Sequence, residues 1–267
     1  MKTAKMVSWL LVVTLLLGCM IFPASAEGER LPPPEIMERE DLNFPYLTFG
    51  AYEQDNNLEN GPEPIEWLVL KEEDGRALVL SRYALALMKY HHTVAIDSSV
   101  TWETWESRAW LNGEFLEAAF SKAEQERIPT VTVETPMVHD HDPGFDNVPV
   151  NDTEDKLFLL SMQEASRYLK GGKARRCQPT AYAIAGYEAA MGQDWETSMS
   201  GFWRREEYMG NCVWYLRSQG KFPGSAALVE VYGRMTYMFD AMIYLPELIV
   251  RDFMWGIRPA MWIDLTP

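Results

Sequence analysis

The sequence contains CVWYLRS at residues 212–218 and GIRPAMWI at residues 256–263. Each segment has the apolar and aromatic composition of a buried β-strand, and each places one arginine, Arg217 or Arg258, inside it. A guanidinium in such surroundings needs partners, because an unpaired buried charge is costly. We therefore expect both arginines to lie in strands and to have specific partners.

Upstream of these segments, the pattern predicts a β-hairpin and then helices. The apolar runs 65–70 and 77–81 are separated by polar residues that include the turn pair Asp74-Gly75. The periodicity then becomes helical, which predicts a short helix over 83–90. The same two periodicities predict two helical pieces over 102–120 broken at Asn112-Gly113, a strand over 156–160, a helix over 180–190 and a strand over 229–232.

Two helix starts are marked by capping boxes, at Ser121–Glu124 and at Ser161–Glu164. The second box directly follows a predicted strand. Strands and helices come in groups rather than in strict alternation, and no internal repeat is present. The fold class predicted from this order is α+β, as one domain over residues 43–267.

The N-terminus predicts export. Lys2 and Lys5 precede an apolar run that ends before Ala24-Ser25-Ala26, which is the pattern of a secretory (Sec) signal peptide over residues 1–26. An alternative is a lipoprotein anchored through Cys19. No later apolar run is long enough to predict a membrane span.

Residues 27–42 are acidic, contain three consecutive prolines and are predicted to form an extended tether. The net charge is −15 and becomes −17 once the two lysines of the signal peptide are removed. So acidic a chain is a poor partner for nucleic acid or anionic lipid.

Two cysteines, Cys177 and Cys212, remain after the predicted signal peptide. An even number of cysteines in an oxidising compartment predicts a disulfide between them. The alternative is a reactive or copper-binding thiol pair. No histidine lies near either cysteine in the sequence to lower its pKa, which favours the disulfide.

Five ordered motifs resemble the secreted bacterial domain-of-unknown-function family 6273. They are the FGAY and PIEWLVL segments that begin at Phe49, TWE and RAWLN from Thr101, DKLFLLS from Asp155, TAYA from Thr180, and the two arginine segments. The resemblance runs from about Phe49 to Ile263. The two arginine segments are also similar to those of C-type-lectin-like and formylglycine-generating-enzyme-like (sulfatase-modifying-factor-like) domains, which implies that fold. Formylglycine-generating enzymes use two cysteines close together near the C-terminus, and the wide separation of the two cysteines here argues against that oxidase activity.

Seven residues are candidates for ligand binding: Trp102, Trp105, Arg108, Asn112, Trp214, Arg217 and Arg258. One interpretation is that the arginines fasten helix to sheet through carboxylates such as Asp155 or Glu66. The other is that the arginines and aromatic residues line a groove for an anionic or sugar ligand.

A histidine- and aspartate-rich loop is the candidate metal site. His139, His141, Asp142 and Asp146 offer nitrogen ligands for zinc or copper and oxygen ligands for calcium. The spacing fits no established metal motif, and the calcium-binding signatures of lectins are missing. A solvated acidic loop is the alternative.

Signals for catalysis are mostly negative. The sequence has no Gly-x-Ser-x-Gly elbow, phosphate-binding glycine loop or His-Glu-x-x-His motif. Glu103 and Glu106 are favoured at a helix start by the helix dipole alone. We therefore expect an exported, non-catalytic binding module for a glycan or another extracellular partner. The alternatives are a metal- or thiol-dependent enzyme and a structural cell-envelope protein.

Overall fold

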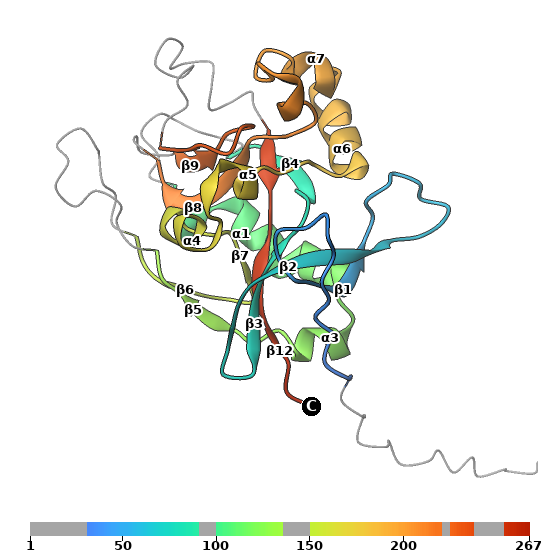
Figure 1. Ribbon diagram of the computed structural model, residues 1–267, viewed down its shortest axis with the longest axis vertical. Helices are drawn as coiled ribbons and strands as arrows, with labels where there is room; N and C mark the ends of the chain where they lie inside the picture. Colours follow the sequence, from blue (N-terminus) through green and yellow to red (C-terminus); the bar gives the residue numbers. More distant parts are fainter. Residues whose placement is uncertain (1–30, 91–99, 136–149, 221–224, 238–253) are drawn as a thin grey trace, which may run out of the picture. The chain divides into compact units, whose positions relative to one another are not determined.

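A computed structural model of the chain describes residues 31–90, 100–135, 150–220, 225–237 and 254–267 (Figure 1). Helices and strands both form within the unit Leu31–Pro267, which confirms the predicted α+β class. In these ranges no helix is both long and apolar enough to cross a membrane. The predicted signal peptide and the candidate metal loop from His139 to Asp146 lie outside the described residues.

The first sheet has five strands, and every neighbouring pair in it is antiparallel. Its order is β1 (Tyr46–Tyr52), β2 (Glu63–Glu73), β3 (Arg76–Ser81), β12 (Ala260–Asp264) and β7 (Leu157–Phe158). Strands β2 and β3 confirm the predicted hairpin. Asp74 and Gly75 at its turn have φ angles of 50° and 73°, the left-handed conformation that a tight hairpin turn of this kind requires.

The second sheet has the order β10 (Met235–Thr236), β9 (Ala226–Val229), β8 (Trp214–Gln219), β11 (Trp255–Ile257) and β4 (Ala86–Met88). Strands β8 and β11 run parallel and are paired at Trp214 and Gly256, so the two arginine-containing segments are neighbours. The chain then passes from β11 into β12 of the first sheet, with Arg258 and Pro259 at the crossing. Both segments therefore form strands, as predicted.

Two predicted elements are wrong. Residues 83–90 form no helix but contain β4, which pairs antiparallel with β11. Tertiary pairing with a strand far along the chain overrides the local periodicity. The strand predicted over 229–232 is the end of β9 followed by a turn, in which the N–H of Gly233 donates to the carbonyl of Glu230 at 2.7 Å.

The helices connect and cover the strands. In chain order they are η1 (Trp102–Thr104), α1 (Glu106–Trp110), η2 (Leu111–Phe115), α2 (Leu116–Ala119), α3 (Lys122–Glu126), α4 (Met162–Tyr168), α5 (Gly171–Arg175), α6 (Ala181–Met191), α7 (Trp195–Met199) and η3 (Glu206–Tyr208). The predicted break at Asn112-Gly113 is wrong, because the helix continues there as a π-helical turn. Both capping boxes are confirmed at the starts of α3 and α4, and the predicted helix over 180–190 is α6.

A two-stranded ribbon of β5 (Val131–Val133) and β6 (Thr153–Asp155) stands apart from both sheets. Part of the predicted tether, residues 31–42, also contacts the domain. Met37 forms a single antiparallel bridge with Tyr46, and Arg39 forms an ion pair with Glu66 at 2.7 Å.

A buried aromatic cluster joins α2 to the first sheet. The ring of Phe120 lies with its centroid 5.7 Å from that of Phe49, 6.2 Å from Trp67 and 6.1 Å from Phe115. Gly50, at a bulge in β1, makes this approach possible, because a Cβ there would lie 2.5 Å from the Phe120 ring and 2.7 Å from the carbonyl oxygen of Ala119.

Gly50→Ala is expected to lower the free energy of unfolding by about 3 kcal/mol, because it combines a positive φ of 69° with steric overlap. Gly61→Ala is the matched control. Its φ is 80° and nothing lies within 4 Å of the added Cβ, so its loss should be about 1 kcal/mol. Urea denaturation of both variants measures the difference, and equal losses would contradict the packing role of Gly50.

Candidate functional site

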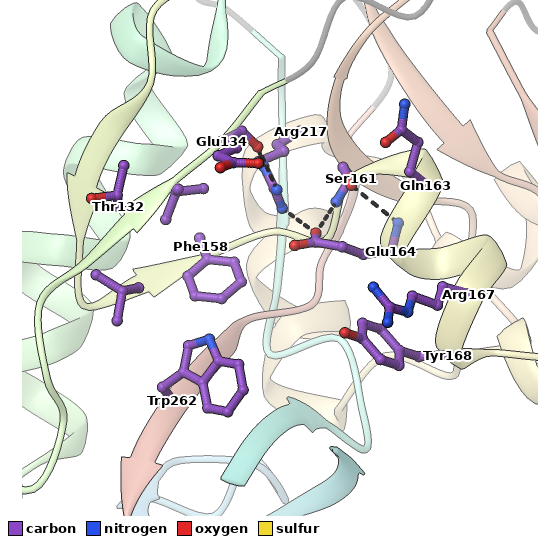
Figure 2. Close-up of a pocket in the computed structure, with 12 residues that line it drawn as sticks. Thr132, Glu134, Phe158, Ser161, Gln163, Glu164, Arg167, Tyr168, Arg217 and Trp262 are labelled. Carbon is purple, nitrogen blue, oxygen red and sulfur yellow. Dashed lines mark hydrogen bonds and ion pairs between the residues drawn. The ribbon is translucent and has the colours of Figure 1, made fainter. Parts of the chain in front are cut away.

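An open cavity of about 320 Å³ is lined by residues of α4, β5, β7, β8 and β12 (Figure 2). We call it the α4 cavity. Its lining residues are Val131, Thr132, Val133, Glu134, Phe158, Ser161, Gln163, Glu164, Arg167, Tyr168, Arg217 and Trp262. One of the seven predicted ligand-binding residues, Arg217, is among them.

The capping box of α4 positions Glu164 at this cavity. The hydroxyl of Ser161 accepts a hydrogen bond from the backbone N–H of Glu164 at 3.1 Å, and Oε2 of Glu164 accepts from the N–H of Ser161 at 2.7 Å. Figure 2 shows Glu164 between Phe158 and Trp262 on one side and Tyr168 on the other. Its second oxygen, Oε1, has no hydrogen-bond partner among the described residues and is available to a ligand.

Arg217 on β8 holds the wall of the cavity together. Its side chain is 3% exposed and forms an ion pair with Glu164. Its guanidinium also donates to the carbonyl of Leu159 at 2.7 Å and to that of Glu134 at 2.7 Å. These bonds join β8, the start of α4 and the residue that follows β5. Arg217 is thus a buried fastener whose hydrogen bonds are directed at the protein itself.

Two polar side chains around the α4 cavity form no hydrogen bond or ion pair within the described ranges. Gln163 and Arg167 are exposed on the same face of α4, four residues apart, and neither side chain forms a hydrogen bond or ion pair with a described residue. Arg167 lies over the ring of Tyr168, 5.5 Å from its centroid. Tyr168 and Trp262 are both partly exposed. The cavity therefore combines two accessible aromatic rings with unused donors and acceptors.

Trp102 and Trp105 lie in the core rather than at a surface. Each is 1% exposed, and their ring centroids are 5.9 Å apart. The ring of Trp105 also contacts Tyr90 and Tyr215, at 4.6 Å and 5.0 Å between centroids. In this arrangement neither indole has a face open to a ligand.

Arg108 and Asn112 fasten the helix to β6 and β7. Arg108 donates to the carboxylate of Asp155 at 2.8 Å. Asp155 is one of the two carboxylates that the sequence suggests as partners for the arginines. Asn112 donates to the carbonyl of Leu157 at 2.8 Å and accepts from the N–H of Lys156 at 2.9 Å. Glu66, the other carboxylate named, pairs with Arg39 and Arg82 instead.

Asp155 is the centre of this fastening. Its side chain is 1% exposed and accepts from the indole N–H of Trp102 at 3.0 Å and from the hydroxyl of Thr153 at 2.6 Å, besides pairing with Arg108. Asn112 also donates to this carboxylate, at 3.4 Å, so the buried side chain satisfies four donors, which come from η1, α1, η2 and β6.

Trp214 and Arg258 lie next to each other in another part of the fold. Both are buried, at 0% and 1% exposed, and the guanidinium carbon of Arg258 lies 5.1 Å from the centroid of the Trp214 ring. Cys177 and Cys212 are free, buried thiols in the structure, with the N–H of Cys212 donating to the carbonyl of Cys177 at 2.8 Å. The two residues are neighbours in the folded chain, although their thiols are free in the structure. The disulfide between them therefore stays a prediction.

The predicted zinc or calcium site at His139, His141, Asp142 and Asp146 lies outside the described residues and also stays a prediction. Within the described ranges, Glu53, Asp55 and Glu63 have carboxylate oxygens within 4.8 Å of one another. Asp55 uses its carboxylate locally, accepting from Asn57 and Asn60 at 2.7 Å and 2.9 Å, so these acids have a structural role in their loop.

A family model described as Domain of unknown function (DUF6273) matches residues 74–265. This match confirms the predicted family and covers every residue that lines the α4 cavity. Searches of curated proteins and of solved structures gave no match.

Asp155→Ala is expected to lower the free energy of unfolding by about 2–3 kcal/mol, because it removes the ion-pair partner of Arg108 and one of the two acceptors of the Trp102 indole. The control is Glu154→Ala, an exposed acid on the same strand, for which the change should stay within about 0.5 kcal/mol. Denaturant unfolding of both variants makes the comparison. A similar effect in the two would show that Asp155 is not the buried fastener described here.

Proposed function

We propose that this chain, which belongs to the DUF6273 family, is an exported, non-catalytic binding module that recognises a carbohydrate in the α4 cavity. The observation that carries the proposal is the pairing of accessible aromatic rings with unpaired polar groups around one open cavity. Its volume of about 320 Å³ lies within the range of small-molecule sites.

The chemistry of a sugar fits these two kinds of group. A pyranose ring has an apolar C–H face, which stacks on an aromatic ring, and a rim of hydroxyls that both donate and accept hydrogen bonds. Trp262 and Tyr168 supply the rings. Gln163, Arg167 and Oε1 of Glu164 supply donors and acceptors on one side of the cavity.

The charges around the cavity favour a neutral ligand over a strongly anionic one. Glu134 and Glu164 both contribute carboxylates to the lining. The buried guanidinium of Arg217 is already paired with Glu164, which leaves Arg167 as the exposed cation of this lining. With Glu164 paired to Arg217, the remaining charges of the lining are those of Glu134 and Arg167, which balance, so the lining has no net positive charge to attract a polyanion.

The C-type-lectin-like fold is part of the proposal. What supports it is the placement of the two arginine segments, which the sequence resemblance singled out, as neighbouring strands β8 and β11. Export through a signal peptide would place the module where glycans are exposed to it, and an anchor at Cys19 would place it at a membrane surface instead.

Binding of the protein to an array of glycans and cell-wall fragments, with calcium and again with a chelator, tests the proposal. Saturable binding of a carbohydrate is expected, and its loss with the chelator would add a metal to the site. Trp262→Ala should weaken that binding at least about tenfold through loss of stacking, and Gln163→Ala about fivefold through loss of hydrogen bonds.

Two matched variants serve as controls. Trp110→Ala removes another partly buried tryptophan, and Gln193→Ala another exposed glutamine, and neither residue lines the α4 cavity. Both should bind as the unchanged chain does, with folding checked by thermal denaturation. If no glycan binds under either condition, the carbohydrate proposal is wrong and a protein ligand becomes the favoured alternative. If all four variants weaken binding equally, the α4 cavity is not the binding site.

A further inference from the structure

A second cavity, of about 470 Å³, lies on another side of the fold and has Cys177 and Arg258 in its lining. Arg258 is 1% exposed. It donates from Nε to the carbonyl of Ser81 at 2.8 Å and from Nη2 to that of Arg82 at 3.4 Å. Its third nitrogen, Nη1, is buried and has no hydrogen-bond partner among the described residues.

The absence of a carboxylate partner distinguishes Arg258 from the other arginines of this cavity. Arg82 pairs with Glu66 at 2.5 Å, and Arg176 pairs with Glu207 at 3.4 Å. Within the described ranges no carboxylate forms an ion pair with Arg258. Because a buried guanidinium without a counter-ion is costly, an anion is expected close to it.

The two cysteine sulfurs are the groups that can supply this anion. Sγ of Cys177 and Nη2 of Arg258 both contact the carbonyl oxygen of Arg82, at 3.8 Å and 3.4 Å, and the charge of Arg258 acts on both sulfurs. Gly256 makes room for them, because a Cβ at that position would lie 3.1 Å from Sγ of Cys212 and 2.9 Å from Cβ of Ala84.

The surroundings distinguish the two thiols. Burial opposes ionisation of Cys177, but the neighbouring Cys212, the charge of Arg258 and the backbone at Ala84 together lower the pKa of Cys177. Burial and the neighbouring Cys177 raise the pKa of Cys212. The remaining charged groups of the cavity lining are Asp41, Arg82, Lys173, Arg176 and Glu207.

We propose that Cys177 and Cys212 form a redox-active dithiol centre, in which Cys177 is the thiolate beside Arg258 and the substrate is a small disulfide that enters through this second cavity. Cys177 lines the cavity and Cys212 does not, so Cys177 makes the first attack. This activity is independent of ligand binding in the α4 cavity.

The reaction is an exchange of two electrons. The Cys177 thiolate attacks one sulfur of the disulfide RSSR, forming a mixed disulfide, while the original S–S bond breaks and RS⁻ leaves. Cys212 then gives its S–H proton to that RS⁻, and its sulfur attacks Sγ of Cys177. The mixed disulfide breaks, the Cys177–Cys212 bond forms and a second RS⁻ leaves. The two cysteines are oxidised and RSSR is reduced.

The test uses the full chain with Cys19→Ser, so that two cysteines are counted, and 4,4′-dithiodipyridine as the small neutral disulfide. The reduced, folded protein should release two thiopyridones per chain, with a pH midpoint below the ordinary thiol value of about 8.5. Cys212→Ser should release one and keep the second pyridine as a mixed disulfide, visible by mass. Cys177→Ser should release none on the same timescale.

Arg258→Gln, checked for folding by circular dichroism, removes the positive charge beside Cys177 and should raise the pH midpoint of the Cys212→Ser variant. Three results would overturn the proposal. The first is that release occurs only after denaturation, which would make the thiols structural. The second is equal reactivity of Cys177→Ser and Cys212→Ser. The third is a purified protein whose disulfide cannot be reduced by a small thiol under native conditions, which would make the bond a permanent bridge.

Discussion

The buried guanidinium of Arg217 imposes a constraint that much of the structure satisfies. A charge at 3% side-chain exposure is tolerated only where partners surround it, and here these are Glu164 and the backbone carbonyls of Leu159 and Glu134. They come from the start of α4, from the residue after β7 and from the residue after β5. One side chain on β8 therefore fixes three separate segments, and the α4 cavity is the space enclosed between them.

Other buried arginines use the same principle, with different consequences. Arg127 is fully buried and donates to the carbonyls of Leu31, Asp264 and Thr266, so it joins the first described residue to the C-terminal segment. Arg258 donates to two backbone carbonyls but has no carboxylate. Arginine fits these positions better than lysine, because its planar fork reaches several acceptors at once. Because no carboxylate of the described residues pairs with Arg258, the sulfurs of Cys177 and Cys212 are the groups that can balance its charge.

Much of the fold can be predicted from the sequence where local chemistry decides it. The Asp74-Gly75 turn and the capping boxes at Ser121 and Ser161 depend on neighbouring residues alone, and each is confirmed. Strand β4 was missed because its partner, β11, is remote in the sequence. In the site, the sequence predicts Arg217 as a ligand-binding candidate, whereas it predicts Trp262 only as part of a strand. Gln163 lies within the Ser161–Glu164 capping box and Arg167 one turn later, so the box predicts the helix that carries both residues, whereas the cavity beside them forms only through tertiary contacts. Which cation lies beside Cys177 depends on tertiary contacts that no local pattern reports.

The measurement that tests this account most directly is the free energy of unfolding of Arg217→Lys, with the exposed Arg205→Lys as the control. Lysine keeps the charge but cannot bond Glu164 and two carbonyls at once, so the account predicts a loss of about 3 kcal/mol for Arg217→Lys and a change within about 0.5 kcal/mol for the control. A loss no larger than that of the control would contradict the claim that this guanidinium holds the α4 cavity together.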